Sequence, residues 1–222
     1  MNRFERSYQI QQLKDIPEWD VLIIGGGATG LGLAVDGASR GYKTLLVEQA
    51  DFAKGTSGRS TKLVHGGVRY LAQGNVSLVK EALRERGYLL RNAPHLTENA
   101  SFIIPCYSWF RAIYYWIGLK LYDVLSGRLS LGKSEWISRK KTLARLPAVQ
   151  SKSLKCGVLY HDGIFDDARL AVNLAQTAIS QGGIVLNYFR LNSFIKNPEN
   201  KLTGAIIEDQ ENGKLYQINA KT

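Results

Sequence analysis

The sequence predicts an α/β fold built on a parallel sheet, from three features near its start. Residues 20–24 (DVLII) end in a continuous apolar run, which is typical of a strand buried on both faces. A glycine-rich turn follows at 25–30, and an apolar stripe at helical spacing then continues to about Arg40. A second apolar run, at 43–48, ends in Glu48. This order of strand, turn, helix and strand predicts a Rossmann-like dinucleotide-binding unit.

The glycines of the turn have separate tasks. Gly25, Gly27 and Gly30 satisfy the pattern G-x-G-x-x-G. The first permits a tight exit from the strand, the second leaves room for a pyrophosphate, and the third lets the helix pack closely on the sheet. Glu48 lies where a carboxylate accepts hydrogen bonds from ribose hydroxyls, and its charge disfavours the 2′-phosphate of NADP. The pattern alone leaves FAD, NAD and a turn without a ligand as alternatives.

The rest of the chain continues the mixed pattern. Gly, Ser and Thr are frequent at 51–74, which predicts an extended loop with short ordered pieces. Helices are expected at 75–91, with Asn75 as N-cap, and from Asp166 or Asp167 onward. The last part predicts a β-meander, with strands near 184–189, 191–196, 202–208 and 214–220.

Composition narrows the classes of partner. The formal net charge of +10 favours anionic partners, but the chain has no zinc finger, RNP-like strand or dense basic arm, so nucleic acid is not expected. Cys106 and Cys156 are far apart and lack metal-ligand spacing, which predicts two ordinary thiols and no metal site. The first twenty residues are polar and carry both signs of charge, unlike a secretory signal.

One segment, at 103–125, is rich in Trp, Tyr and Ile. Pro105, Arg111, Lys120 and Asp123 interrupt it, and a spanning helix needs about twenty nearly uninterrupted apolar residues, so a transmembrane span is not expected. Two readings stay open: a helix packed on the protein's own core, and an aromatic, basic segment lying on a bilayer surface.

A second loop decides between the nucleotide cofactors. Residues 55–71 read GTSGRSTKLVHGGVRYL, with hydroxyls, basic side chains and a glycine pair that lets the backbone pass close to a flat group. Together with IIGGGATGLGLAVDGASRG at 23–41 and DGIFDDARLAVNLAQTA at 162–178, this loop closely resembles the FAD-dependent, quinone-reducing glycerol-3-phosphate dehydrogenases. The resemblance covers nearly everything after about residue 18.

The resemblance implies a two-dinucleotide-binding-domain flavoprotein with FAD as cofactor, and it implies roles for particular residues. The FAD pyrophosphate and ribose would be held by Gly25, Gly26, Gly27, Thr29, Gly30 and Glu48. The flavin side would be lined by Thr56, Ser57, Ser60, Thr61, Lys62, His65, Gly66 and Gly67. Arg69 and Tyr70 occupy the family's position at the substrate pocket, whereas Asp166, Asp167 and Arg169 are expected to be structural.

The implied reaction is oxidation of sn-glycerol 3-phosphate to dihydroxyacetone phosphate, with electrons passed to a membrane quinone. The cofactor carries the difficult chemistry, and the protein positions the substrate. Arg69 is the candidate cation for the substrate phosphate. His65 is a candidate catalytic base, although a role in orienting the flavin is equally compatible with its position. Two alternatives remain: an oxidase that uses oxygen, and a non-catalytic N-terminal fragment of the dehydrogenase.

The resemblance also implies a domain layout. We expect a polar lead-in at 1–18 and an FAD-binding domain at 19–222, with a helical, membrane-proximal insertion at 103–160 and the β-meander at 184–222. The chain is shorter than the family's members, so the remaining FAD and substrate contacts are expected beyond Thr222. The expected location is the cytoplasmic side of the inner membrane, as a peripheral protein, or the cytoplasm. A homo-oligomer stays open.

Overall fold

The computed structural model describes residues 2–222, apart from the side chains of Arg69 and Ala72. The chain divides into two compact units. Unit 1 comprises Met1–Thr61 and Asp167–Thr222, and unit 2 comprises Lys62–Asp166. Unit 2 therefore contains all of the expected insertion at 103–160 and also the forty residues or so before it.

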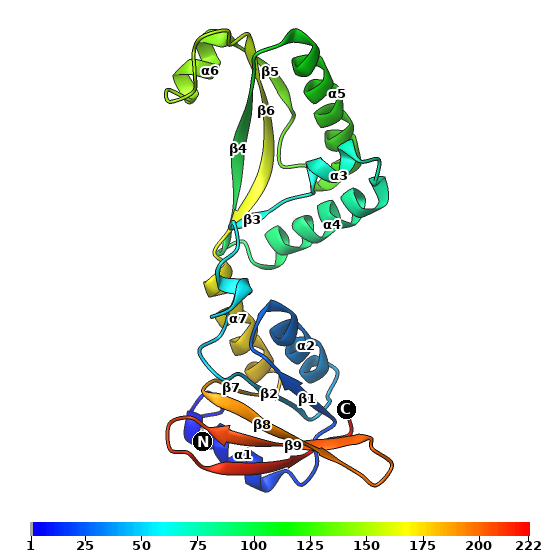
Figure 1. Ribbon diagram of the computed structural model, residues 1–222, viewed down its shortest axis with the longest axis vertical. Helices are drawn as coiled ribbons and strands as arrows, with labels where there is room; N and C mark the ends of the chain where they lie inside the picture. The colour runs from blue at the N-terminus through cyan, green and yellow to red at the C-terminus, as the bar shows by residue number, and fades with distance from the viewer. Residues whose placement is uncertain (1) are drawn as a thin grey trace. The chain divides into compact units, whose positions relative to one another are not determined.

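Unit 1 is a mixed α/β unit (Figure 1). Its elements are α1 (Arg6–Asp15), β1 (Val21–Ile24), α2 (Ala28–Ser39), β2 (Thr44–Val47), the 3₁₀ turn η1 (Thr56–Gly58), α7 (Asp167–Ser180), β7 (Ile184–Leu186), β8 (Phe189–Lys196), β9 (Leu202–Asp209) and β10 (Leu215–Asn219). The predicted strand–turn–helix–strand unit is present as β1, α2 and β2, so the predicted fold class is confirmed.

A parallel sheet of order β1-β2-β7 forms the centre of unit 1. All four residues of β2 are buried, as expected for a strand covered on both faces. Leu46 faces α2 and α7 in one core cluster, while Leu45 and Val47 face the antiparallel strands in another. Figure 1 shows this layering, with α2 and α7 side by side above the sheet. The two faces of one short strand thus join both layers.

The prediction for the C-terminal strands is confirmed only in part. β8, β9 and β10 form the expected antiparallel meander. The strand expected at 184–189 is not part of it: Ile184–Leu186 pairs in parallel with β2 instead. The reason is the preceding helix α7, which brings the chain back to the parallel sheet beside β2. Parallel strands are usually joined by such a helical crossover connection. Three consecutive buried residues at this position indicate a strand covered on both faces.

The residues expected to be a polar lead-in contain a helix that packs on unit 1. In α1, Leu13 belongs to the core cluster between the two sheets. Gln9 is buried as well, and its side-chain oxygen accepts a hydrogen bond from the Val185 N–H at 2.9 Å. The helix therefore satisfies a donor of β7 that no neighbouring strand satisfies.

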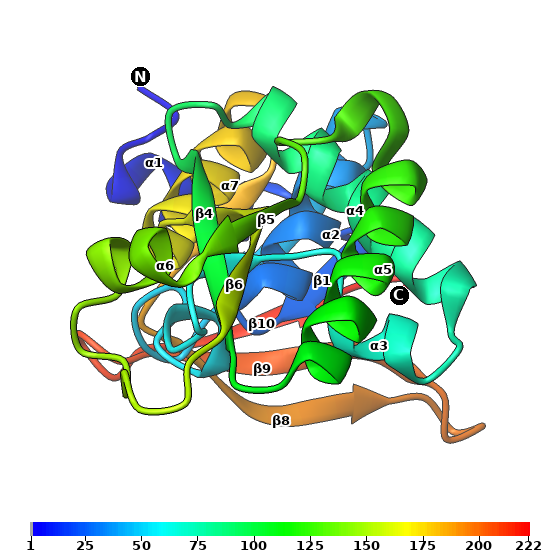
Figure 2. The same cartoon turned by 90° about the horizontal axis from the view of Figure 1, so that it is seen from above.

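Unit 2 combines an antiparallel sheet with helices. Its elements are β3 (Leu63–Val64), α3 (Val68–Ala72), α4 (Val76–Asn92), β4 (Thr97–Cys106), α5 (Trp109–Ser126), the 3₁₀ turn η2 (Gly127–Leu129), β5 (Glu135–Ser138), α6 (Arg139–Arg145) and β6 (Cys156–Phe165). β6 is the central strand and pairs with β3, β4 and β5. Figures 1 and 2 show α5 on one side of the β4–β6 pair and α6 on the other.

The loop expected at 51–74 contains short ordered pieces, as predicted, and they are η1, β3 and α3. The expectation for the aromatic segment of unit 2 needs correction. The aromatic segment at 103–125 is not one helix, because its first residues complete β4 and α5 begins only at Trp109. Pro105 is tolerated there because β4 pairs with β6 alone and is an edge strand. The predicted α4, by contrast, has its expected cap, since Asn75 Oδ1 accepts from the Leu78 N–H at 3.2 Å.

Candidate nucleotide-binding site

The glycine turn between β1 and α2 is shaped by a positive backbone angle. Gly25 has φ of +116°, a conformation that side chains disfavour. Its N–H donates to the Val47 carbonyl at 2.8 Å, which ties the turn to β2. A Cβ on Gly30 would overlap the carbonyl group of Gly25 and would lie 3.3 Å from Ile23 Cγ2. Helix α2 thus approaches the sheet as closely as its backbone allows.

Glu48 lies directly after β2 and is bound to the same turn. Its Oε2 accepts from the Gly26 N–H at 2.7 Å, and its Oε1 accepts from the Ala50 N–H at 2.8 Å. The carboxylate is half-buried, and each of its oxygens keeps further acceptor capacity. Two backbone donors therefore hold in place the acid that was predicted to meet a ribose.

Ser57, from η1, covers the beginning of α2. Its Oγ accepts from the Ala28 N–H at 2.9 Å. A Cβ on Gly27 would lie 3.1 Å from the same hydroxyl oxygen. The hydroxyl thus sits at the positive end of the helix dipole, beside the glycine that the pattern assigns to pyrophosphate approach. This contact joins two predicted site residues that are thirty positions apart.

A cavity of about 560 Å³ opens at this turn. Its lining includes β1, the glycine turn, Thr29, Leu33 and Ser57, and it continues to Thr222. The cavity runs along β1 to its carboxyl end, beside a helix N-terminus, and this end of a parallel strand is the usual location of a nucleotide in open α/β sheets. The absent side chains at Gly27 and Gly30, the oriented Glu48 and the polar cap of α2 fit the pyrophosphate and ribose of a dinucleotide.

The remaining predicted residues of unit 1, on the flavin side, lie on either side of Ser57 in the sequence. Thr56 and Thr61 are exposed. Ser60 is held by Asp167, whose Oδ2 accepts from the Ser60 hydroxyl at 2.7 Å and from the Ser60 N–H at 3.1 Å. Asp167 is buried at the first residue of α7. It therefore supports the loop that carries Ser57, a contribution for which the sequence offers only the local helix-start signal.

The glycine pair of unit 2 follows β3. Lys62 has φ of +56° and Gly67 has φ of +71°, so the segment is tightly bent at both ends. His65 is exposed, and its Nδ1 accepts from the Gly67 N–H at 3.0 Å. Because that nitrogen is an acceptor, the proton of the neutral ring lies on Nε2. His65 therefore presents an N–H donor outward.

A buried polar network that the sequence does not predict lies behind the glycine pair. The Gly66 N–H donates to Tyr122 Oη at 2.7 Å, and that hydroxyl donates to Asp162 Oδ2 at 2.9 Å. Asp162 Oδ1 in turn accepts from the Arg86 guanidinium at 2.9 Å. Burial, together with the neighbouring Asp162 carboxylate, raises the pKa of Tyr122 far above its usual range, so the phenol keeps its proton. The members come from three separate elements, α4, α5 and β6, and from the loop after β3, so no local sequence motif predicts them.

Arg69 and Tyr70 are in helix α3. The side chain of Arg69 lies outside the described part of the structure. Tyr70 is 44% exposed, and its ring would meet a Cβ placed on Gly67. Among the described residues, no group of His, Cys, Asp and Glu side chains is arranged to hold a metal ion.

The fold and this site together define a Rossmann-type nucleotide-binding protein. Residues 20–220 match the family model described as FAD dependent oxidoreductase. The chain belongs to the FAD dependent oxidoreductase family.

Relatives with curated names are similar along nearly the whole chain. The mitochondrial glycerol-3-phosphate dehydrogenase of Schizosaccharomyces pombe is 44% identical over 97% of this chain and 34% of its own length. The enzyme of the same name from Mus musculus is 42% identical over 97% of this chain and 31% of its own length. The chain thus spans about a third of the length of these relatives.

A solved structure agrees. The glycerol-3-phosphate dehydrogenase of Bacillus halodurans, complexed with FAD, has a TM-score of 0.74 and 32% identity, over 99% of this chain and 36% of that chain. The L-proline dehydrogenase of P. horikoshii, at 14% identity and a TM-score of 0.67, shares the fold, over 91% of this chain and 51% of its own.

Proposed function

We propose that the chain is the FAD-binding part of an enzyme that oxidises sn-glycerol 3-phosphate to dihydroxyacetone phosphate and passes the electrons to a respiratory quinone. The observation that carries the proposal is the constellation of Gly27, Glu48 and Ser57 around the start of α2, in a chain 44% identical to a glycerol-3-phosphate dehydrogenase. Its parts match the phosphate, ribose and close-approach requirements of a dinucleotide.

Bound FAD would supply the acceptor for the hydride that leaves C2 of the substrate. The protein's own contribution begins with Glu48, which accepts from ribose hydroxyls while two backbone amides hold its carboxylate. The N-terminus of α2 and Ser57 bind the pyrophosphate, together with Thr29. The roles of Thr56, Ser60, Thr61 and of Lys62 to Gly67 beside the flavin rest on the resemblance.

His65 fits an orienting role better than that of a base. Its Nδ1 lone pair is used by the Gly67 N–H, so the neutral ring offers a donor at Nε2 and has no lone pair there to take the substrate proton. We propose that His65 donates a hydrogen bond to an acceptor of the cofactor or substrate. In this arrangement the base that removes the hydroxyl proton is a different group.

The exposed apolar side of helix α5 supports the proposal of a membrane surface and an apolar electron acceptor as partners. Its outward side carries Phe110, Ile113, Ile117, Leu121 and Val124, of which Phe110 is 80% and Val124 is 75% exposed. These positions recur at helical spacing, and an apolar stripe on a helix requires an apolar partner. Within the described residues, no helix is long and apolar enough to cross a membrane.

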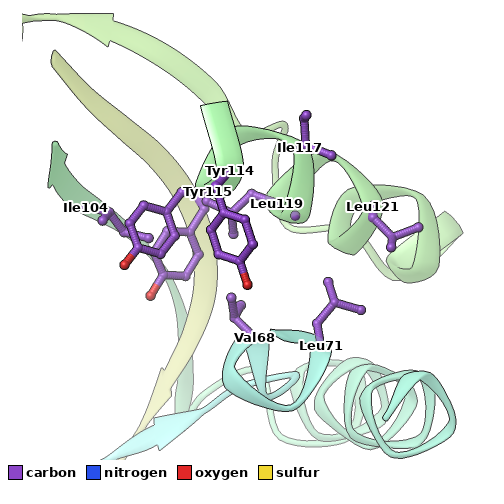
Figure 3. Close-up of a pocket in the computed structure, with 10 residues that line it drawn as sticks. Val68, Leu71, Ile104, Tyr114, Tyr115, Ile117, Leu119 and Leu121 are labelled. Carbon is purple, nitrogen blue, oxygen red and sulfur yellow. The ribbon is translucent and has the colours of Figure 1, made fainter. Parts of the chain in front are cut away.

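A cavity of about 550 Å³ lies next to this stripe in unit 2 (Figure 3). Val68 and Leu71 of α3 face Leu119 and Leu121 of α5 across it, and Tyr114 and Tyr115 close one end. An apolar cavity with few polar groups suits a ring with an apolar tail. We propose this face of α5 as the contact with the bilayer and the quinone.

The test begins with cofactor binding in the full-length protein. A purified flavoprotein should show flavin absorbance, and Glu48→Ala should lose most of it. A protein that neither retains nor binds added FAD would refute the proposal. Turnover of glycerol 3-phosphate with a quinone analogue, against peroxide formation without it, then distinguishes a dehydrogenase from an oxidase. The same assay on the 222-residue chain alone tests the remaining alternative, because FAD binding without turnover there would identify the chain as a non-catalytic fragment.

Substrate binding has its own test at Arg69. The variant Arg69→Ala should raise KM for glycerol 3-phosphate by about tenfold or more, because a charge-assisted contact to the phosphate is lost, while FAD content stays the same. The control is Arg91→Ala, at an exposed position near the end of α4. An unchanged KM would remove the proposed role of Arg69.

A further inference from the structure

The buried network of unit 2 has an unusual composition for a protein interior. Arg86, Tyr122 and Asp162 are 1%, 2% and 3% exposed, respectively. Burying an ion pair is costly, and such a pair is weak evidence for stability by itself. Because stability alone does not explain an ion pair buried beside a predicted site, we ask which part of the site the pair holds in place.

The directions of the hydrogen bonds are settled by chemistry. A backbone N–H only donates, so Tyr122 Oη is the acceptor for Gly66. The phenol has a single proton, which goes to Asp162. The carboxylate is paired with Arg86, whose second amino group donates to the Leu129 carbonyl at 3.0 Å. The guanidinium also lies 5.8 Å from the centre of the Tyr122 ring.

The glycine pair has no freedom on the side of this network. A Cβ on Gly66 would collide with the side chain of Leu83 and would lie 2.5 Å from Tyr122 Oη. The next residue, Gly67, has a left-handed backbone conformation, and its N–H donates a hydrogen bond to His65 Nδ1. Tyr122 thus acts on one amide of the turn, and the adjacent amide sets which nitrogen of His65 carries the proton.

We propose that Tyr122, held by Asp162 and Arg86, is a positioning residue that fixes the His65–Gly67 turn and thereby presents His65 as a hydrogen-bond donor. The inference rests on the proposed function for what the turn meets, namely the flavin. Its structural part, the fixed turn, does not depend on the cofactor. In this proposal Tyr122 contacts neither the flavin nor the substrate, and it acts only through the backbone of Gly66.

The test is Tyr122→Phe in the full-length protein. Phenylalanine keeps the ring that packs over Arg86 and removes only the hydroxyl. The matched control is Thr142→Val, which removes a buried hydroxyl elsewhere in unit 2, where Thr142 Oγ1 donates to the Ser138 carbonyl at 2.9 Å. Tyr122→Phe deletes two internal hydrogen bonds and Thr142→Val deletes one, so Tm is measured for both variants and the readouts are compared at a temperature where both are folded.

Three readouts are compared. Hydrogen exchange at the Gly66 amide, isolated by overlapping peptides, should become at least about tenfold faster in Tyr122→Phe only, because the amide loses its acceptor. If the turn then holds its binding-competent form about a tenth of the time, the Kd for FAD rises about tenfold. The absorbance spectrum of the bound flavin should also shift in Tyr122→Phe and not in Thr142→Val.

The outcomes separate the inference from the proposed function. Equal exchange, affinity and spectra in the two variants overturn the inference while FAD binding by the unmodified protein upholds the function. Absence of FAD binding in the unmodified protein refutes the function, and the exchange readout still decides the inference. If Tyr122→Phe does not fold, the unmodified protein decides: exchange of Gly66 as fast as an exposed loop overturns the proposed contact.

Discussion

Gly30 offers a strict test of the packing between α2 and β1. We compare Gly30→Ala with Gly32→Ala, two substitutions in the same helix. A Cβ on Gly32 meets nothing within 4 Å, whereas a Cβ on Gly30 strikes the Gly25 carbonyl, which is backbone and cannot turn aside. The pair therefore separates the effect of helix propensity from the effect of close approach.

The magnitudes follow from these surroundings. Alanine is favoured over glycine in a helix by about 0.8–1.0 kcal/mol, so Gly32→Ala should stabilise the protein by roughly that amount. Gly30→Ala gains at most the same, and overpacking costs about 1–3 kcal/mol, with the upper end expected for a backbone collision. The two variants should therefore differ by about 3 kcal/mol in the free energy of unfolding.

Thermal unfolding measures this difference directly. For a protein of this size, about 3 kcal/mol corresponds to a difference in Tm of roughly 6–12 °C. FAD affinity should also fall in Gly30→Ala, because the collision moves the start of α2 away from the phosphate position. Equal Tm values for the two variants would refute the reasoning that Gly30 is required for close packing.

Three further predictions concern single contacts. Glu48→Gln should lower the free energy of unfolding by about 1–3 kcal/mol even without FAD, because the amide nitrogen of glutamine cannot accept from a backbone N–H. Denaturant unfolding of the apoprotein measures this change, and an unchanged midpoint would contradict the prediction. Ser57→Ala should cost about 1 kcal/mol, since the Ala28 N–H loses its cap, and should weaken FAD binding; titration with FAD against Thr56→Ala is the comparison. Burial raises the pKa of Cys106 to about 11 and raises that of Cys156 above its usual value, so both thiols are mainly protonated at pH 8. Alkylation mapped by mass spectrometry should therefore label neither at pH 8 before unfolding, and rapid labelling of the native protein would disprove their burial.

Local patterns were enough for the βαβ unit. The strands at β1 and β2, the turn from Gly25 to Gly30 and the acid at Glu48 are close in sequence, and their apolar runs and glycine spacing have direct physical causes. The predicted N-cap at Asn75 and the meander of β8, β9 and β10 are confirmed for the same reason: each depends on contacts among neighbouring segments.

The pairing of strands that are far apart in the chain could not be predicted from the sequence. Residues 103–106 (IIPC) continue directly into the apolar, aromatic segment that follows. Their register with β6, from Ile103 opposite Leu159 to Cys106 opposite Cys156, makes them a strand. Likewise, Ile184–Leu186 joins the parallel sheet because α7 carries the chain back to β2. Strand pairing depends on partners that a single segment does not identify.

The sequence by itself determined the nucleotide fold, the glycine turn with its acid, and the family resemblance, because these depend on short-range spacing and residue type. Only the tertiary structure decided how the site residues are held. Ser57 covers the start of α2, and Asp167 holds Ser60 across more than a hundred residues. Tyr122 meets Gly66 fifty-six positions away. Buried polar groups need partners that only the folded chain brings within hydrogen-bonding distance.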